Sequence, residues 1–391
     1  MALRRIDSID EMHTYLAVAM QLEHATIPPY LTALYSMLPG RNSESSEVMR
    51  IVVVEEMLHM TLVANLMNAV GRHPDLTASG FVPRYPTHLP DGEADFEVSI
   101  RPFGREAVET LMRIERPGTL TDGLDLVSRP RSARALLPAY AHDDDQDMHF
   151  YSIGDFYGEI ERGLRHLQTH EESGGATLFS GDPEAQVVIG EYFPDASQVG
   201  PVVDLDSALF AIDFITEQGK GRGERIYGDF DELSPFYRLE QILHGRHYQH
   251  GDAPGWPSGK TFQVDWTAVH PVAVDARIDD FALGTPVRAL VDEFAGTYAG
   301  FLRTLTDAYS GTPKAARPCL RHDVRPARPV PAHRRAAPPD PRRTARRTGV
   351  RLVVAPGRAS GRSGWVRGAG QQPRGLPQRL DERARGRGPD A

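Results

Sequence analysis

Residues 52–66 constrain the fold most, because this helical pattern carries polar side chains on the face that should be apolar. At 3.6 residues per turn, Glu56 and His59 fall on the same stripe as the valines and leucines around them. A buried carboxylate is costly unless it is paired, protonated or bound to a metal. The pattern therefore indicates either a Glu–His core pair or half of a metal site. Glu55 points about 100° away around the helix and is predicted to face solvent.

Residues 8–38 form a second long helical pattern, which begins with a Ser-x-x-Glu capping box at Ser8. Its apolar residues recur at spacings of three and four, and Glu23 occupies one of these core positions. Pro28 and Pro29 are expected to interrupt the helix, because each removes a backbone donor. A second acid on a core stripe favours the metal site over an isolated Glu–His pair.

Two later helical segments also carry acids. In residues 206–219, Glu217 shares a face with Phe210 and Phe214. In residues 231–246, Glu232 is in register with the apolar face.

A second Glu-x-x-His pair beginning at Glu232 would need histidine at the position that Pro235 occupies. Ser234 and Pro235 instead have the pattern of an N-cap followed by proline at the first helical position. Glu232 is therefore predicted to lie just outside the helix.

Other polar residues have weaker claims to a site. The run from His142 to Asp147 could attract a hard cation, but we favour a solvated acidic loop because its spacing is not diagnostic of a cation site. Glu159 and Glu161 lie beside an apolar helical face at residues 152–168 and are predicted to be at the surface. Four residues could replace the missing histidine or form a solvated helix end: Glu240, His244, His247 and His250.

An insertion of about residues 72–150 separates the helical segments and is rich in proline and glycine. Within it we predict a short helix at 105–113. Strands are predicted at residues 96–100, 187–189 and 261–264. Residues 286–309 form a last amphipathic pattern whose wide apolar face is expected to pack against the other helices.

The charge is unevenly distributed. Residues 315–391 contain 19 Arg and five acidic residues, so a net of +14 in this tail leaves −23 for residues 1–314 of a chain with a total charge of −9. The tail lacks Ile, Phe, Tyr and Met and is predicted to be disordered. Its Arg, Pro, Gly and Ala are encoded by GC-rich codons, so we hypothesise a frameshifted terminus. A nucleic-acid-binding arm is the alternative.

Cysteine usage and hydropathy predict the compartment. A single cysteine, Cys319, forms no disulfide framework within the chain. The first residues lack the apolar core of a signal peptide, and no run of 18 apolar residues occurs. We therefore predict a cytoplasmic protein that has no membrane partner and acts on a small-molecule substrate. A nucleic-acid partner is expected only if the tail is native. An oligomer is possible.

The acids can be combined into one site. Ferritin-like four-helix bundles hold two iron or manganese ions between glutamates from two helices and Glu-x-x-His pairs from the other two. The predicted fold class is therefore mainly α, a ferritin-like helical bundle over residues 1–314 with a mixed loop and strand insertion. The candidate metal ligands are Glu23, Glu56, His59, Glu217 and Glu232.

Several motifs resemble one family. They are QLEHATIPPYL at 21–31, EEMLH at 55–59, FVPRYP at 81–86, RPF at 101–103 and TEQG at 216–219. Over about residues 8–314 the chain resembles the ferritin-like domain named for iminophenyl-pyruvate dimer synthases. That family includes the VioB, RebD and StaD enzymes of bisindole pigment and antibiotic biosynthesis.

The resemblance implies an iron-dependent oxidase that couples two imines of an aromatic 2-oxo acid, with Glu23, Glu56, His59 and Glu217 as ligands. Pro235 departs from the family pattern and leaves one iron or two, or manganese, as alternatives. Tyr30 and Tyr35 could stack on a substrate ring or pack in the core. Family association suggests haem, for which the sequence has no attachment motif. The competing hypothesis is a degenerate, non-catalytic metal-binding or scaffold protein.

Overall fold

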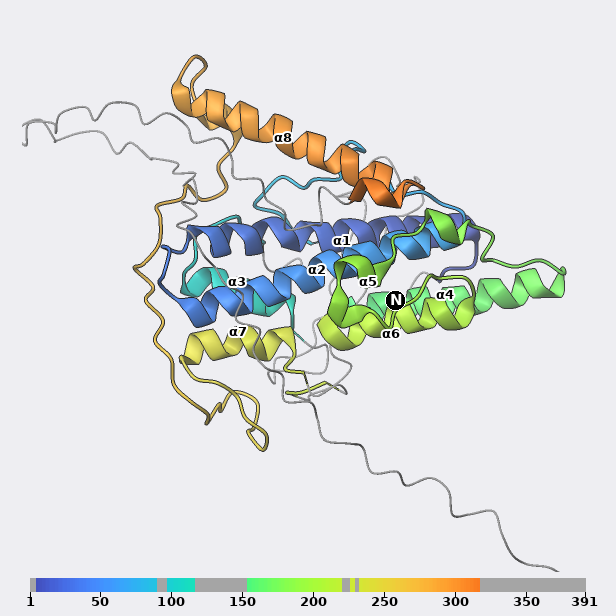
Figure 1. Cartoon of the computed structure of the whole chain (residues 1–391), viewed down its shortest axis with the longest axis horizontal. Helices are drawn as coiled ribbons and strands as arrows, with labels where there is room; N and C mark the ends of the chain where they lie inside the picture. Colours follow the sequence, from blue (N-terminus) through green and yellow to red (C-terminus); the bar gives the residue numbers. More distant parts are fainter. Residues whose placement is uncertain (1–4, 90–96, 117–152, 220–225, 229–231, 317–391) are drawn as a thin grey trace, which may run out of the picture. The chain divides into compact units, whose positions relative to one another are not determined.

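The computed structural model describes residues 5–89, 97–116, 153–219, 226–228 and 232–316, all of them in one compact unit. The acidic run at 142–147 and the tail from 317 onward lie outside the described residues. The described helices are α1 Ile9–Ser36, α2 Ser43–Ala69, α3 Arg105–Ile114, α4 Ile153–Ser173, α5 Ile189–Tyr192, α6 Leu205–Gly219, α7 Pro235–His244 and α8 Pro286–Tyr309 (Figure 1). The mainly α prediction is confirmed.

The long helices α1 and α2 pack against each other, and two columns of shorter helices complete a bundle. Both α3 and α4 contact α1, whereas both α6 and α7 contact α2. The columns meet where α3 contacts α7 and where α4 contacts α6. Figure 1 shows α3 and α4, and likewise α6 and α7, following one another along the α1–α2 pair. Two columns of the bundle are therefore each divided into two helices.

Helix α1 begins as predicted but does not break at its prolines. The hydroxyl of Ser8 accepts a hydrogen bond from the backbone N–H of Glu11, and the helix then runs through Pro28 and Pro29. The missing N–H of Pro29 would have bonded the carbonyl of Ala25. The Tyr85 hydroxyl donates to this carbonyl at 2.6 Å instead. The prolines therefore do not convert the helix into a turn, because a distant side chain satisfies the freed acceptor; a kink at this point stays a prediction.

The predicted strands do not form in the described residues. Val98 makes an isolated bridge with Thr87, and Thr261 makes one with Arg246. Val187 is in a coil segment, where its N–H donates to the side chain of Asn65 and its carbonyl accepts from it, both at 2.9 Å. The side-chain amide of Asn65 on α2 thus makes the two backbone hydrogen bonds that a paired strand would have made.

Glu159 on α4 is buried, contrary to the surface prediction. Its Oε1 accepts the backbone N–H of Ile6 at 2.6 Å, and both carboxylate oxygens accept from Arg162. The segment around Ile6 approaches α4 so closely that a Cβ added at Gly163 would lie 2.7 Å from the Cβ of Ile6. Glu161 is partly exposed and pairs with Arg165 at 3.0 Å.

Within the part of the chain that the structure describes, α8 has buried side chains in its C-terminal half only. Leu302, Leu305, Ala308 and Tyr309 are buried, whereas Leu290 is 51% exposed and Phe294 is 66% exposed. The expectation that the whole apolar face packs against the bundle was therefore wrong. Amphipathic spacing predicts which face is apolar, but it does not say how far along the helix a partner extends.

Among the described helices, α2 is long and apolar enough by composition to cross a membrane. Most of its apolar window, 78%, is buried inside the protein. Such burial is typical of a core helix in a bundle. The cytoplasmic location remains a prediction from the sequence.

Candidate metal centre

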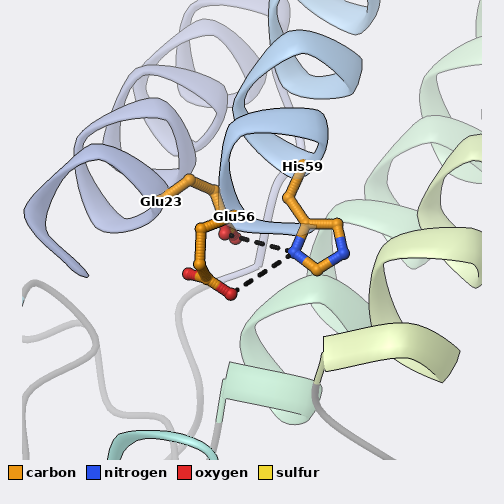
Figure 2. Close-up of side chains that lie close together, drawn as sticks. All are labelled: Glu23, Glu56 and His59. Carbon is orange, nitrogen blue, oxygen red and sulfur yellow. Dashed lines mark ion pairs between the residues drawn. The ribbon is translucent and has the colours of Figure 1, made fainter. Parts of the chain in front are cut away.

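The centre of the bundle holds three polar side chains from α1 and α2. Glu23, Glu56 and His59 are each 0% exposed, and one potential ligand atom of each lies within 4.8 Å of the others. The helical repeat places Glu56 and His59 on one side of α2, and Glu23 faces them from the middle of α1 (Figure 2). These are three of the five residues that the sequence pattern combined into one site.

The two carboxylates approach the same nitrogen. His59 Nδ1 lies 3.6 Å from Glu23 Oε2 and 3.6 Å from Glu56 Oε1, as the dashed lines of Figure 2 show. The other carboxylate oxygens accept hydrogen bonds from hydroxyl groups. Tyr157 donates to Glu23 Oε1 at 2.6 Å, and Thr26 donates to Glu56 Oε2 at 2.6 Å.

Electrostatics make the imidazole basic. Complete burial lowers the pKa of His59, but the two carboxylates of Glu23 and Glu56 beside its ring outweigh burial and raise this pKa to about 10. A metal ion bound by the same side chains would replace the proton as the positive charge between the carboxylates.

Three buried atoms of the group fit a metal. Glu23 Oε2 and both ring nitrogens of His59 have no hydrogen-bond partner in the structure, an uncommon state for buried polar atoms. Two ligand atoms that each bind one ion at about 2.1 Å are separated by at most about 4.2 Å, and the 3.6 Å separations satisfy this limit. One imidazole and two carboxylates suit iron or manganese.

Glu217 and Glu232 are not members of this three-residue group among the described residues. Glu217 is half-buried near the end of α6. The Glu232 side chain is 51% exposed just before α7 and lies 4.0 Å from Arg238. Ser234 and Pro235 occupy the predicted N-cap and first helical positions. The ligand roles of Glu217 and Glu232 remain predictions.

The Phe residues that accompany Glu217 on α6 do not form one buried face. Phe214 is buried, whereas Phe210 is 43% exposed. Helix α6 packs against both α2 and α4, so its buried surface does not follow the single face predicted for it.

Glu55 is also buried, against the prediction that it faces solvent. Its side chain is 12% exposed and lies 3.6 Å from the guanidinium of Arg238 on α7. Burial raises the pKa of Glu55 to about 7, while the charges of Arg238 and His59 act to lower it. The helix column formed by α6 and α7 covers the side of α2 that the stripe argument left to solvent.

The sequence pattern missed a further buried acid, Glu115, at the C-terminal end of α3. Its Oε1 accepts the hydroxyl of Tyr30 at 2.8 Å, and Tyr30 is completely buried. Burial, followed by the nearby charges of Glu115 and Glu56, raises the pKa of Tyr30 well above its ordinary value. Tyr35, the other aromatic candidate, is 75% exposed.

The sequence analysis also missed Tyr157, the hydrogen-bond donor to Glu23, because a hydroxyl on an apolar stripe gives no periodic signal.

The substitute ligands suggested near the end of α7 lie elsewhere. Glu240 accepts the hydroxyl of Tyr248, His244 and His250 are exposed, and His247 packs on Phe262. None of them belongs to the described metal-competent group.

The profile of the ferritin-like family matches residues 16–244, more than half of the chain and including the three central side chains. The chain belongs to the ferritin-like family. A crystal structure of a ferritin-like protein from Caulobacter vibrioides has the same fold, with a TM-score of 0.51 and 24% identity, covering 79% of this chain and 89% of that one. The predicted ferritin-like bundle is thereby confirmed.

One relative is an enzyme. Dichlorochromopyrrolate synthase from Lentzea aerocolonigenes is 25% identical over 287 residues, which cover 68% of this chain and 25% of the synthase. This ferritin-like chain thus corresponds to about a quarter of the relative's length, and the activity of the whole synthase does not transfer with that match.

Proposed function

We propose that this ferritin-like protein is an iron-dependent oxidoreductase that acts on an amino-acid-derived imine or 2-oxo acid in secondary metabolism. The observation that carries the proposal is the fully buried group of Glu23, Glu56 and His59, whose potential ligand atoms converge. The similarity to dichlorochromopyrrolate synthase supports the substrate class. Oxidative dimerisation is the reaction that the resemblance of the motifs suggests.

The side chains divide the work of such a site. Glu23 and Glu56 would bind iron through oxygen and His59 through nitrogen, and bound iron would supply the one-electron chemistry with dioxygen. The two carboxylates offset most of the ion's charge in a site without exposure to water. The apolar side chains of α1 and α2 around the group exclude bulk solvent and protect reactive species from side reactions.

Metal analysis followed by an oxygen-consumption assay tests the proposal. Purified protein reconstituted with Fe²⁺ under anaerobic conditions should retain iron, whereas Glu56→Ala and His59→Ala should lose it. The loaded protein should then consume dioxygen when an arylpyruvate imine is added. Iron-loaded protein that leaves a panel of such imines and 2-oxo acids unoxidised would contradict the oxidase assignment.

A non-catalytic, degenerate ferritin-like protein is the second candidate. The observation that favours it is the position of Glu217 and Glu232 outside the described group, which leaves three ligands where a dinuclear bundle has six. A protein that remains metal-free after reconstitution, with unchanged thermal stability, would support this candidate and exclude the oxidase.

A further inference from the structure

Each carboxylate of the central group has its two oxygens in different environments. One oxygen of Glu23 and one of Glu56 face His59 Nδ1 at 3.6 Å. The opposite oxygen of Glu23 accepts a hydrogen bond of 2.6 Å from Tyr157. The opposite oxygen of Glu56 lies 2.6 Å from the Thr26 hydroxyl, whose single proton also has the Glu23 carbonyl oxygen within reach at 2.8 Å and favours the charged, nearer acceptor. Both hydroxyl groups come from buried residues, Tyr157 on α4 and Thr26 on α1.

This difference bears on how many ions the carboxylates can hold. In the common bridging mode a carboxylate offers one oxygen to each of two ions. An oxygen that already accepts a short hydrogen bond has part of its lone-pair capacity occupied, so such a carboxylate favours one ion bound through its other oxygen. Charge-assisted hydrogen bonds from O–H to a carboxylate are about twice as strong as neutral ones, so the two hydroxyl groups oppose rotation into a bridging geometry.

We infer that the site binds one metal ion, held by Glu23, Glu56 and His59, and that Tyr157 and Thr26 are positioning residues that enforce it. The inference rests on the metal-binding part of the proposed function and goes beyond it by giving the stoichiometry. It also separates this chain from dinuclear ferritin-like bundles, in which carboxylates bind two ions.

The neighbouring buried acids are engaged elsewhere. Glu55 faces Arg238 at 3.6 Å, and Glu115 accepts the hydroxyl of Tyr30 at 2.8 Å. Neither belongs to the three-residue group in the described part of the chain. A second ion could therefore use Glu55 or Glu115 only by drawing them away from these partners.

Titration of the metal-free full-length protein with Mn²⁺, followed by electron paramagnetic resonance, measures the stoichiometry. We expect one Mn²⁺ per chain with the spectrum of an isolated ion. Two ions per chain with a spin-coupled spectrum would overturn the inference and leave the oxidoreductase proposal standing. Protein that binds neither Mn²⁺ nor Fe²⁺ would overturn both.

The positioning role is tested with Tyr157→Phe and Thr26→Val, which remove the hydroxyl groups with little change of shape. Loss of such an outer partner should weaken Mn²⁺ binding about 10- to 100-fold. Thr26→Ser keeps the donor and should retain the affinity. Unchanged affinity in both hydroxyl-deleted variants would overturn the positioning role.

Matched controls come from a second buried tyrosine–threonine pair. The hydroxyl groups of Tyr309 and Thr61 bond each other at 2.9 Å and touch none of the candidate ligands through the hydrogen bonds described. Tyr309→Phe and Thr61→Val therefore remove comparable buried hydrogen bonds and should bind Mn²⁺ like the parent. Equal weakening in these controls would assign the effect to general loosening of the bundle and overturn the positioning role.

Discussion

At the scale of single residues, the core of this protein accepts carboxylates wherever a specific partner is available. Glu23 and Glu56 meet an imidazole and two hydroxyl groups, Glu115 meets Tyr30, and Glu159 meets a backbone N–H and Arg162. A buried carboxylate without such partners would be expelled or neutralised. The acids on apolar stripes could be recognised in the sequence, whereas Glu159 could not, because its partner Ile6 is 153 residues away.

Glu159→Ala tests this account of buried acids. The substitution leaves the Ile6 N–H and the Arg162 guanidinium without their acceptor, so we expect a loss of about 2–3 kcal/mol in the free energy of unfolding. Urea denaturation measures it. Glu161→Ala, two residues away on the same helix, removes only a partly exposed i,i+4 pair and should cost about 0.5 kcal/mol or less. Equal losses in the two variants would show that Glu159 behaves as a surface residue.

At the scale of elements, helices α1 and α2 hold the three metal-competent side chains, and shorter helices supply their supports. Tyr157 lies in the first turns of α4, and Arg238 lies in the first turns of α7. Helix α1 continues through Pro28 and Pro29 one turn after Glu23, and the Tyr85 hydroxyl supports this course by donating to the carbonyl of Ala25.

Tyr85→Phe tests the role of that hydroxyl. Without it, the carbonyl of Ala25 is buried with neither a helical donor nor the side-chain donor, so we expect the free energy of unfolding to fall by about 1–2 kcal/mol. Thermal and chemical denaturation report the change. Tyr35→Phe on the same helix alters a side chain that is 75% exposed and serves as the control with no expected effect. A Tyr85→Phe protein as stable as the parent would mean that water or a backbone shift satisfies the carbonyl.

At the scale of the whole described unit, hydrogen bonds attach α8 to the two long helices α1 and α2. The Tyr309 carbonyl accepts from Asn68 on α2 at 2.6 Å, and the Tyr298 hydroxyl meets the ring of His24 on α1 at 2.7 Å. Burial lowers the pKa of His24 to about 4, so its ring is neutral at pH 7. The exposed Leu290 and Phe294 contribute little to this attachment.

Two truncations on α8 compare its halves. Leu305→Ala removes a side chain that is 1% exposed and should cost about 2–4 kcal/mol of unfolding free energy. Phe294→Ala changes a side chain that is 66% exposed and should leave stability within about 0.5 kcal/mol. Chemical denaturation of both variants gives the comparison. A large loss in Phe294→Ala would mean that this aromatic side chain is covered in solution.

By itself, the sequence determined that Glu23, Glu56 and His59 belong to a helical core, because the period of 3.6 residues forces each onto an apolar stripe. It also placed Ser234 and Pro235 at a helix start and so set Glu232 outside the helix. Only the tertiary structure decided that α3 with α4 and α6 with α7 form divided columns, that Glu55 is covered, and that Tyr157 and Thr26 each engage one carboxylate oxygen. The physical reason is that periodicity reports which face of one helix is buried, whereas a hydrogen-bond partner depends on which distant helix arrives at that face.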